Sequence, residues 1–281
     1  MTAGVPYAEV IGDPIAHSKS PLIHRFWLGK LGIEGEYRAV RVEAGGLGAY
    51  LAERLGQAQW LGCNVTMPLK IEALALAGDN RSEQAKEAGA ANLLLPGRSA
   101  VRAENSDVVA VERLLEPHFR AKEDVVVHLI GTGGAAAAAA AAVRRIGPPI
   151  SLFTYARSKE GALAFRRRVG LEDSLAYCHL LGQSEAWGSP TDVVINATPL
   201  GMTGQDALAF PLTHFQPGAL VFDMIYHPLE TELLAEARAQ GMRVMDGLQM
   251  LVEQAAMSFA LFFGHDAPRA HDEELRSLLI A

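Results

Sequence analysis

Residue types that mark whole classes of protein are scarce in this sequence. Among 281 residues the only cysteines are Cys63 and Cys178, far apart and outside any Cys-x-x-Cys pair, which excludes a disulfide framework and a cysteine-based metal centre. Lys and Arg number 25 against 32 Asp and Glu, for a formal charge of -7. That balance cannot neutralise a run of phosphates, so we expect neither nucleic acid nor an anionic membrane as a partner. A small-molecule ligand and a cytoplasmic location remain the expectation.

Motifs of several enzyme classes are missing as well. The sequence has no Gly-x-Ser-x-Gly turn and no P-loop lysine, so hydrolase and NTPase activities have no support. His17 and His24 are seven residues apart, without the i, i+4 spacing of a zinc site, and we predict no metal. Residues 1–12 carry no basic leader, so we expect no signal or transit peptide.

One uncharged run is nominally long enough to span a bilayer. It covers residues 125–143, but it consists of an apolar start, the glycine-rich segment Gly131–Gly134 and eight alanines. This order predicts a strand, a tight turn and the start of a helix, so we expect no membrane-spanning segment.

The rest of the chain, 49% apolar, alternates strand-like and helix-like segments, which predicts an α/β fold with largely parallel sheets. We expect strands at 8–11, 36–42, 60–65, 91–95, 101–104, 125–130, 150–154, 175–179, 192–196, 220–223 and 243–245, and helices at 21–31, 69–77, 107–119, 133–146, 159–169, 230–240, 247–263 and 268–280. The strands at 91–95 and 101–104 form a hairpin in this prediction. The charged stretch at 120–124 is typical of a domain boundary.

The segment Gly131-Thr132-Gly133-Gly134-Ala135-Ala136 fits the pattern Gly-x-Gly-x-x-[Gly/Ala] directly after an apolar strand. Glycines there permit a tight turn and let a pyrophosphate approach the backbone amides and the positive end of the helix. The motif therefore predicts a dinucleotide site. The alternative is a glycine-rich turn without a ligand.

The end of the next strand bears on which dinucleotide binds. An acidic residue about 20 residues after the glycines would hold the ribose hydroxyls of NAD, but the sequence here reads Thr154-Tyr155-Ala156-Arg157-Ser158-Lys159. Cations in place of the acid favour the 2'-phosphate of NADP. Alternatively, Arg157 and Lys159 are only solvated residues at the start of a helix.

Polar residues also follow predicted strands in the first half of the chain. The segment Asn64–Lys70 and the triplet Asn105–Asp107 lie at two strand-to-helix junctions, where a lysine and an aspartate within hydrogen-bonding distance could share proton transfer. Alternatively, Lys70 is surface and Asp107 a helix N-cap. Ser18 and Ser20 could bind a carboxylate or cap a helix. Gln254 has apolar neighbours and needs a polar partner.

Together these motifs resemble the shikimate dehydrogenase family along nearly the whole chain. The matching segments, in order, are Gly12-Asp13-Pro14, Ser18–Pro21 with His24, Asn64–Lys70, Gly89–Asn92, the glycine-rich turn at Gly131, Asn196–Met202, Phe222–Tyr226 with Pro228 and Thr231, and Gly247–Ala255.

The resemblance implies a two-domain fold with the active site in the cleft between the domains. A discontinuous substrate-binding domain would comprise residues 1–108 and 246–281, and a Rossmann-like domain residues 109–245. It also implies NADP-dependent reduction of 3-dehydroshikimate to shikimate, a step of aromatic amino acid biosynthesis, by a monomer or homodimer. Lys70 and Asp107 would be the catalytic pair.

The resemblance also assigns the remaining site residues. The substrate would be surrounded by Ser18, Ser20, Thr66, Asn92, Tyr226 and Gln254. The cofactor would be held by Gly131, Gly133, Gly134, Ala135, Arg157, Ser158, Lys159, Thr198, Met224 and Gly247.

The sequence departs from the family pattern mainly in the nucleotide half. Thr132 replaces an alanine of the glycine-rich turn, Ala156-Arg157-Ser158 replaces Asn-Arg-Thr, and Gly161 stands where a second basic residue is usual. In the other half, Ala110 and Arg25 replace a glycine and an asparagine. Two alternatives stay open: a quinate dehydrogenase that uses NAD, and a catalytically idle protein that senses the metabolite.

Overall fold

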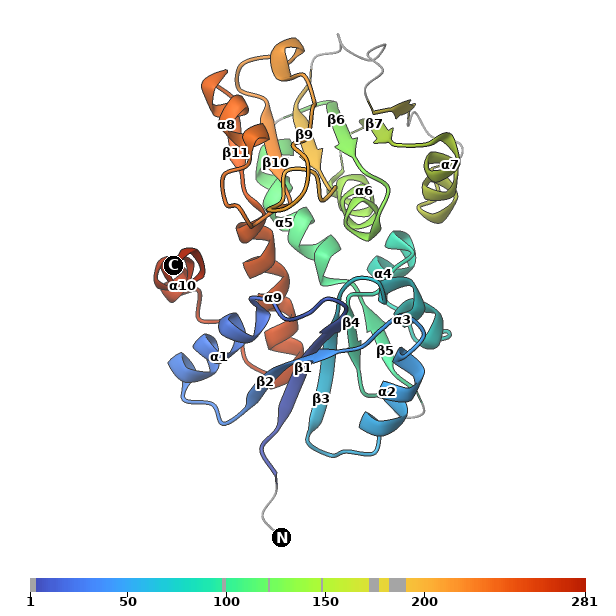
Figure 1. Cartoon of the computed structure of the whole chain (residues 1–281), viewed down its shortest axis with the longest axis vertical. Coiled ribbons are helices and arrows are strands. Elements are labelled where there is room, and N and C mark those ends of the chain that lie inside the picture. Colours follow the sequence, from blue (N-terminus) through green and yellow to red (C-terminus); the bar gives the residue numbers. More distant parts are fainter. Residues whose placement is uncertain (1–3, 98–99, 121, 148, 172–176, 182–190) are drawn as a thin grey trace. The chain divides into compact units, whose positions relative to one another are not determined.

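The computed structural model describes residues 4–97, 100–120, 122–147, 149–171, 177–181 and 191–281. Contacts divide the chain into two compact units (Figure 1). Unit 1 consists of Met1–Ser106 and Val252–Ala281, and unit 2 of Asp107–Leu251. The charged stretch at 120–124 lies inside unit 2, so the prediction that it separates domains is wrong. The division falls instead at the start of a helix.

Unit 1 contains a five-stranded mixed sheet with the strand order β2-β1-β3-β4-β5. Its elements, in chain order, are β1 (Tyr7–Gly12), α1 (Ser20–Leu31), β2 (Glu36–Arg41), α2 (Leu47–Arg54), β3 (Trp60–Val65), α3 (Lys70–Leu76), α4 (Glu83–Ala88), β4 (Leu93–Leu95) and β5 (Arg102–Glu104). Strand β1 is buried along its whole length and pairs in parallel with both β2 and β3. Strands β4 and β5 form the predicted antiparallel hairpin.

The C-terminal segment completes unit 1. Helix α9 (Gly247–Phe263), whose residues up to Leu251 are counted with unit 2, brings Phe259 and Phe262 into an aromatic cluster with Trp27 and Tyr37, and all four side chains are buried. The helix predicted at 268–280 begins as a 3-10 turn, η2 (Arg269–His271), and continues as α10 (Asp272–Ile280).

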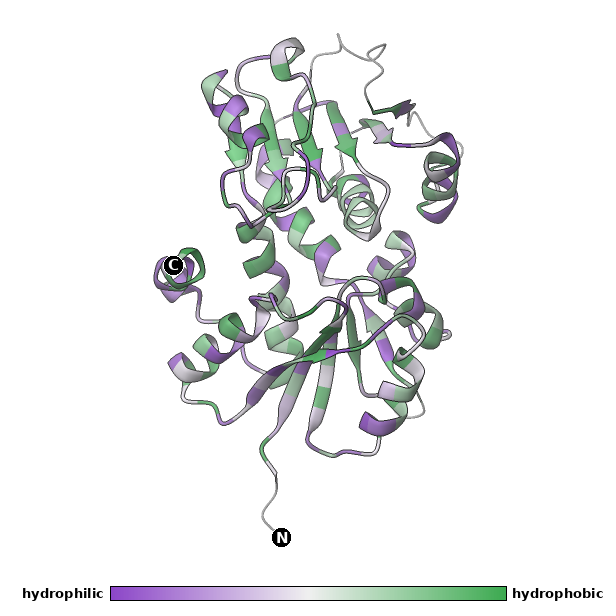
Figure 2. Ribbon diagram, viewed as in Figure 1, coloured by the Kyte–Doolittle hydropathy of each residue, from purple (hydrophilic) through white to green (hydrophobic). Residues whose placement is uncertain are grey.

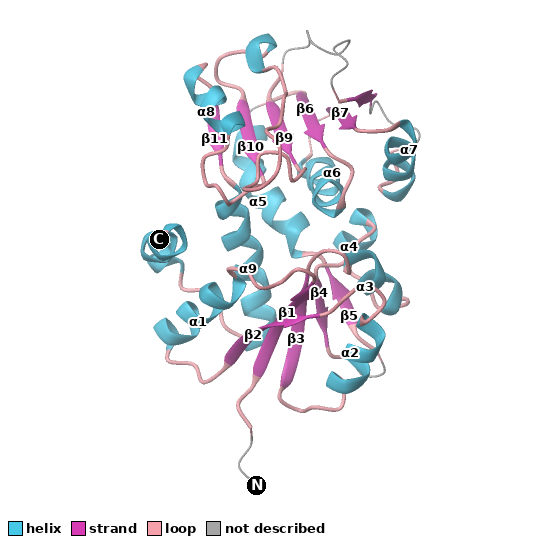
Figure 3. Ribbon diagram, in the orientation of Figure 1, coloured by secondary structure: helices cyan, strands magenta, loops and turns pink. Residues whose placement is uncertain are grey.

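Unit 2 contains a six-stranded sheet whose strands are all parallel, in the order β11-β10-β9-β6-β7-β8 (Figure 3). Its elements are α5 (Ser106–Phe119, whose first residue is counted with unit 1), β6 (Val125–Ile130), α6 (Gly134–Ile146), β7 (Ile150–Ala156), α7 (Lys159–Arg168), β8 (Tyr177–Leu180), β9 (Val193–Asn196), η1 (Leu212–His214), β10 (Leu220–Asp223), α8 (Glu232–Ala239) and β11 (Arg243–Met245). Numbered from β6 as the first strand, this is the order 3-2-1-4-5-6 of the Rossmann fold.

The uncharged run 125–143 forms the predicted strand, turn and helix. In α6 the residues from Ala136 to Val143 are all buried, and their small side chains let the helix pack closely on β6 and β7. Figure 2 shows that β6, β9 and β10 are largely hydrophobic, as expected for strands with both faces covered. None of the described helices is long and apolar enough to cross a membrane.

Candidate active site

In unit 1 the loops after β1 and β3 lie against each other. A Cβ atom added to Gly12 would stand 2.4 Å from Cγ2 of Thr66 and 2.7 Å from the carbonyl oxygen of Met67. The same Met67 oxygen accepts a hydrogen bond from the amide of Asp13 at 2.9 Å. Only glycine permits this approach, which places Thr66 directly after β3 and beside the end of β1.

Lys70 is the first residue of α3 and is half-buried. Its carbonyl oxygen accepts a hydrogen bond of 2.9 Å from the amide of Ala91. Ala91 immediately precedes Asn92, another predicted site residue. The backbone therefore holds the start of α3 against the segment that carries Asn92.

Asn92 in turn holds the start of α5. Its side chain, 3% exposed, accepts a 2.7 Å hydrogen bond from the amide of Ser106 and donates one of 3.0 Å to the Ser106 hydroxyl. The first amides of a helix have no partner within it, so this contact stabilises the helix terminus. Asp107 follows in the first turn, where the helix dipole favours a negative charge. It lies within α5, so the interpretation of Asp107 as an N-cap is wrong.

Gln254 finds the polar partner that its apolar neighbours require. Its Oε1 accepts a hydrogen bond of 3.4 Å from the Ser106 hydroxyl. Its backbone oxygen accepts one of 3.0 Å from Ser258, whose hydroxyl also accepts a 2.8 Å bond from Asn64. Tyr37 donates to the Asn64 oxygen at 2.6 Å. Sequence reasoning missed Tyr37 and Ser258, although Ser258 stands one helical turn after Gln254.

Ser18 and Ser20 stand at the start of α1, in a separate segment of unit 1. The Ser18 hydroxyl accepts a hydrogen bond of 3.3 Å from the amide of Ser20, the first residue of α1. The side chain of Lys19, between them, donates to the carbonyl oxygen of Leu279 near the end of α10. Lys19, and neither serine, is the N-cap residue of α1, and its side chain makes no capping hydrogen bond, so the interpretation of the serines as N-caps is wrong.

In unit 2 the glycine-rich turn lies where the strand order reverses. Gly131 has a φ of +113°, and an added Cβ atom would be 3.0 Å from both the Ala197 carbonyl oxygen and Cγ2 of Thr198. The turn after β6 therefore contacts the loop after β9, the neighbouring strand. Open α/β sheets bind nucleotides at this reversal point. Around the Cβ position of Gly133 there is open space, which leaves room for a ligand.

The predicted cations follow β7. Arg157 and Lys159 are exposed, and between them Ser158 caps α7 by accepting a 3.1 Å hydrogen bond from the amide of Gly161. No acidic residue stands at the end of β7. Sequence reasoning overlooked Glu160, an exposed carboxylate in the first turn of α7, which lowers the net positive charge of this surface.

Two buried side chains organise the loops that carry the predicted cofactor contacts Thr198 and Met224. Asn196 accepts hydrogen bonds from the amide and hydroxyl of Thr198, at 3.0 and 2.8 Å, and donates one of 3.0 Å to Asp223. Asp223 also accepts from the Ile225 amide at 3.1 Å and the Thr231 hydroxyl at 2.7 Å. Burial raises the pKa of Asp223, and these hydrogen bonds oppose the shift. Sequence reasoning did not assign either residue to the site, though both end apolar strands.

Two further predicted residues, Met224 and Tyr226, follow β10, and a third, Gly247, begins α9. An added Cβ atom on Gly247 would be 2.2 Å from the Met224 carbonyl oxygen, so glycine is required at this crossing. The Met224 amide donates to the Asn196 carbonyl oxygen at 3.0 Å, which joins it to the network of Asn196 and Asp223. Tyr226 is half-buried, and burial raises its pKa.

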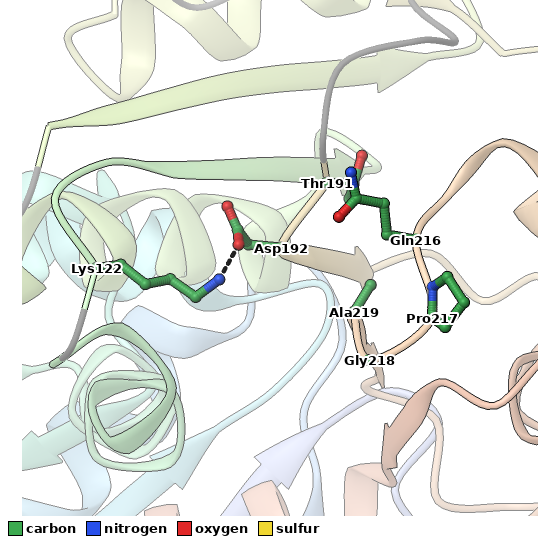
Figure 4. A pocket seen from close by; sticks show the side chains of 7 residues that line it. All are labelled: Lys122, Thr191, Asp192, Gln216, Pro217, Gly218 and Ala219. Atoms are coloured by element: carbon green, nitrogen blue, oxygen red, sulfur yellow. Dashed lines mark hydrogen bonds and ion pairs between the residues drawn. The ribbon is translucent and has the colours of Figure 1, made fainter.

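A polar pocket of about 150 Å³ lies at the opposite, amino end of the strands of unit 2 (Figure 4). It is lined by Lys122, Thr191, Asp192, Gln216, Pro217, Gly218 and Ala219. Lys122 and Asp192 form an ion pair across it. None of the predicted site residues lines this pocket. Within the described part of the chain, no group of three or more His, Cys, Asp or Glu side chains could hold a metal ion.

The structure thus brings the predicted residues together in local groups. In unit 1, Lys70 is joined to the segment of Asn92, and Asn92 to Gln254 through Ser106. In unit 2, Gly131 lies against Thr198, and Met224 against Gly247. Unit 2 has a glycine-lined space beside the reversal of strand order, and cations follow its second strand. These features define unit 2 as a dinucleotide-binding domain of the Rossmann class.

Comparison with known proteins identifies the family. Residues 10–94 match the family model of the shikimate dehydrogenase substrate binding domain, and residues 247–275 that of the shikimate 5'-dehydrogenase C-terminal domain. A shikimate dehydrogenase (NADP(+)) of Sphingopyxis alaskensis is 41% identical over 98% of this chain and 97% of its own. The chain belongs to the shikimate dehydrogenase family, as its motifs predicted.

Solved structures of similar proteins agree with this fold. Shikimate 5-dehydrogenase from Thermus thermophilus, in complex with NADP(H) and shikimate, has a TM-score of 0.81 and 30% identity, with 98% of this chain and 99% of that chain covered. Quinate dehydrogenase from Corynebacterium glutamicum, in complex with NAD, has a TM-score of 0.85 and 28% identity, with 98% and 99% covered.

Proposed function

We propose that this protein catalyses the reversible, NADP-dependent reduction of 3-dehydroshikimate to shikimate. The observation that carries the proposal is the role of the Ala91–Asn92 segment. Its backbone holds the start of α3, where Lys70 stands, and its side chain holds the start of α5, where Asp107 stands. One short segment is therefore hydrogen-bonded to the backbone of Lys70 and to Ser106, the neighbour of Asp107, and positioned proton transfer requires such anchoring.

The residues of unit 2 fit NADP(H). The glycine-rich turn has open space at Gly133, and Arg157 and Lys159 present two exposed cations where an acid would favour NAD. When bound, NADPH would supply the hydride, and NADP+ would accept it in the reverse direction. The residues that would hold the cofactor are Gly131, Gly133, Gly134, Ala135, Arg157, Ser158, Lys159, Thr198, Met224 and Gly247.

Lys70 and Asp107 would carry the proton chemistry. The Lys70 ammonium would donate a proton to the oxygen of the substrate ketone as it becomes an alkoxide, and would recover it from the hydroxyl in the oxidation direction. The Asp107 carboxylate would orient the ammonium and the neighbouring substrate hydroxyl.

The remaining predicted residues would bind the substrate. Hydroxyls at Ser18 and Ser20 suit its carboxylate, and Thr66, Tyr226 and Gln254 offer hydrogen bonds to its ring hydroxyls. Asn92 already bonds Ser106 through both atoms of its amide, so we give it a positioning role and, through its second N–H, a contact with substrate.

Quinate is the second candidate substrate, because a quinate dehydrogenase has nearly the same fold. We favour shikimate because the two hydroxyl residues at the start of α1, Ser18 and Ser20, are both serines and neither is threonine, and because the similar Sphingopyxis protein is a shikimate dehydrogenase. The two substrates differ by one ring hydroxyl, and discrimination depends on whether the site leaves that group unpaired.

A four-way assay tests the proposal. The absorbance of reduced nicotinamide is followed with shikimate or quinate, each with NADP+ or NAD+, in the wild type, in Asp107→Asn, and in a control on the same helix, Glu116→Gln. We expect the highest kcat/KM with shikimate and NADP+, a large loss in Asp107→Asn, and none in the control. Preference for quinate with NAD+ would support a quinate dehydrogenase. Nucleotide binding without turnover of either substrate would support a catalytically idle sensor.

A further inference from the structure

Arg168, the last residue of α7, contacts the glycine-rich turn from behind. Its Nη2 donates hydrogen bonds to the carbonyl oxygens of Thr132 and Gly133, at 2.7 and 2.8 Å. The side chain is half-buried, and its Nε is buried without a hydrogen-bond partner among the described residues. The guanidinium also lies 5.7 Å from the ring centre of Phe165. Arg168 therefore differs from Arg157 and Lys159, which are exposed, because its guanidinium is hydrogen-bonded to two carbonyl groups of the glycine-rich turn.

The packing of α7 permits this contact. A Cβ atom added to Gly161 would lie 3.9 Å from the Thr132 hydroxyl and 3.2 Å from that of Ser158, so the first turn of the helix runs beside the glycine-rich turn. Long side chains on a helix point back toward its N-terminus, and this direction takes Arg168 to the turn. Gly161 is also the position at which this sequence lacks a basic residue usual in the family.

The two hydrogen bonds orient the turn. In a planar trans peptide the C=O and N–H groups point in opposite directions. When the carbonyls of Thr132 and Gly133 face Arg168, the amides of Gly133 and Gly134 face away from it. The described backbone offers neither amide an acceptor. Both N–H groups are therefore available to an anion at the N-terminus of α6.

We propose that Arg168 is a positioning residue of the dinucleotide site, an inference that rests on the proposed function. It fixes the two peptides of the turn so that their amides face the pyrophosphate, and it places a positive charge behind them. Because NAD and NADP share the pyrophosphate, Arg168 contributes to the binding of both. Arg157, which faces solvent, contributes to NADP alone.

Nucleotide binding without substrate tests this role. The dissociation constants of NADPH and NADH are measured by the fluorescence of the reduced nicotinamide for the wild type, Arg168→Met, Arg168→Lys, Arg157→Met and the control Arg167→Met. Arg167 is the exposed neighbour of Arg168, so its variant removes the same charge from the same helix end. Thermal unfolding of each variant without ligand accompanies the titrations.

For Arg168→Met we expect about tenfold weaker binding of both nucleotides, since the turn is no longer preorganised. For Arg168→Lys, which keeps the charge but not the planar fork, we expect a loss of about threefold. Arg157→Met weakens NADPH only, and Arg167→Met weakens neither. A purely structural role would lower the melting temperature of Arg168→Met and leave both dissociation constants unchanged, which overturns the inference.

Two further outcomes separate this inference from the proposed function. If the wild type binds NADPH, depends on Arg168 for it and turns over no shikimate, the function fails and the positioning role stands. If the wild type is active and Arg168→Met binds both nucleotides normally, the proposed function stands and the positioning role fails. Should Arg168→Met not fold, wild-type affinity of Arg168→Lys for both nucleotides overturns the inference. A wild type that binds neither nucleotide overturns both.

Discussion

The two units hold their candidate site residues in opposite ways. In unit 1 three buried side chains are bonded in series: Asn92, Ser106 and Gln254 are all at most 9% exposed and share hydrogen bonds. In unit 2 the predicted phosphate contacts, Arg157 and Lys159, are exposed. The buried side chains of Asn196 and Asp223 in unit 2 bond instead to the loops after β9 and β10.

This contrast matches the chemistry proposed for the two groups of residues, with Asp107 of the catalytic pair as the first residue of unit 2. Proton transfer requires reacting groups at fixed distances, so the groups that carry it are anchored through buried hydrogen bonds. Recognition of a phosphate requires charge and permits motion, so long exposed cations suffice. We therefore expect substitutions in unit 1 to change catalysis and stability together, and substitutions at the exposed cations to change cofactor preference alone.

The largest expected effect is that of Lys70→Ala on catalysis. Removal of the proposed proton donor should lower kcat by roughly two to four orders of magnitude, with a much smaller change in KM, because the proton is transferred only in the transition state. Steady-state kinetics with shikimate and NADP+ measure it. Lys86→Ala, which removes an exposed lysine of unit 1, is the control and should keep full activity. An unchanged kcat in Lys70→Ala would remove Lys70 from the chemistry.

Asn92→Ala tests how much the buried hydrogen bonds of unit 1 contribute to the stability of the protein. The substitution leaves the buried amide and hydroxyl of Ser106 without their partner, so we expect the free energy of unfolding to fall by about 2 to 4 kcal/mol. Ser106→Ala, which loses only the hydroxyl, should cost about 1 kcal/mol. Arg157→Ala in unit 2 should stay within about 0.5 kcal/mol of the wild type. Equal losses for Asn92→Ala and Arg157→Ala in denaturant titrations would contradict the contrast between the units.

Local sequence patterns predicted most of the fold. Strands β3, β6, β10 and β11 and helix α9 have the predicted bounds, since each is an apolar segment bordered by turn or polar residues. Helices α2 and α4 were missed. Each is short and buries few side chains, three in α2 and two in α4, so the helical spacing of the buried residues extends over little more than one turn. Helix α8 begins two residues later than predicted because Thr231 caps it.

The site was predictable only where a motif is continuous in sequence. The glycine-rich turn and the Asn64–Lys70 segment stand out by themselves. Asn196 and Asp223 meet from 27 positions apart, and Arg168 reaches Thr132 from 36 positions away. Such pairs depend on strand order and helix packing, which leave no periodicity in one sequence. That is why the sequence indicated the residues facing a ligand better than those that hold them in place.

Arg157→Asp tests whether an exposed cation of unit 2 determines the cofactor preference without affecting stability. Loss of the guanidinium and gain of a carboxylate should lower kcat/KM with NADP+ roughly ten- to hundredfold and leave that with NAD+ unchanged or higher. The melting temperature should not change, because the side chain is exposed. The comparison of both cofactors in wild type and variant measures this. A wild type that prefers NAD+, or a variant with unchanged preference, would refute the assignment.

A pH experiment probes the buried interior of unit 1. His24 is fully buried against Tyr37, with ring centres 3.9 Å apart, and burial lowers its pKa from 6.5 to about 3. Below pH 6.5 the unfolded chain binds a proton that the native chain does not, so stability falls as the pH drops, until about pH 3. Between pH 7 and pH 5 we expect His24 to account for a loss of about 2 kcal/mol.

His24→Phe should remove that part of the acid dependence. Comparing the pH 7 and pH 5 unfolding free energies of one variant cancels any packing cost of the larger ring. His128, whose pKa burial lowers to about 4, leaves an acid dependence of the same sign in unit 2. His265→Asn replaces an exposed histidine and should change nothing. An equally steep acid dependence in His24→Phe would show that His24 is not its source.

The smallest expected effect is at Glu160, which tests whether exposed charges alone set the cofactor preference of unit 2. This carboxylate stands in the first turn of α7, one residue after Lys159, and would repel a 2'-phosphate bound there. Glu160→Gln should therefore lower KM for NADP+ about two- to threefold, leave KM for NAD+ unchanged, and lose this advantage at high salt, because exposed charges are screened. The same carboxylate interacts favourably with the dipole of α7, so the free energy of unfolding of the variant should be lower by about 0.3 to 1 kcal/mol. Glu232→Gln alters an exposed carboxylate in the first turn of α8 and should reproduce the loss of stability without the change in KM. An identical KM for NADP+ in Glu160→Gln and wild type at low salt would mean that contacts other than these surface charges determine the preference.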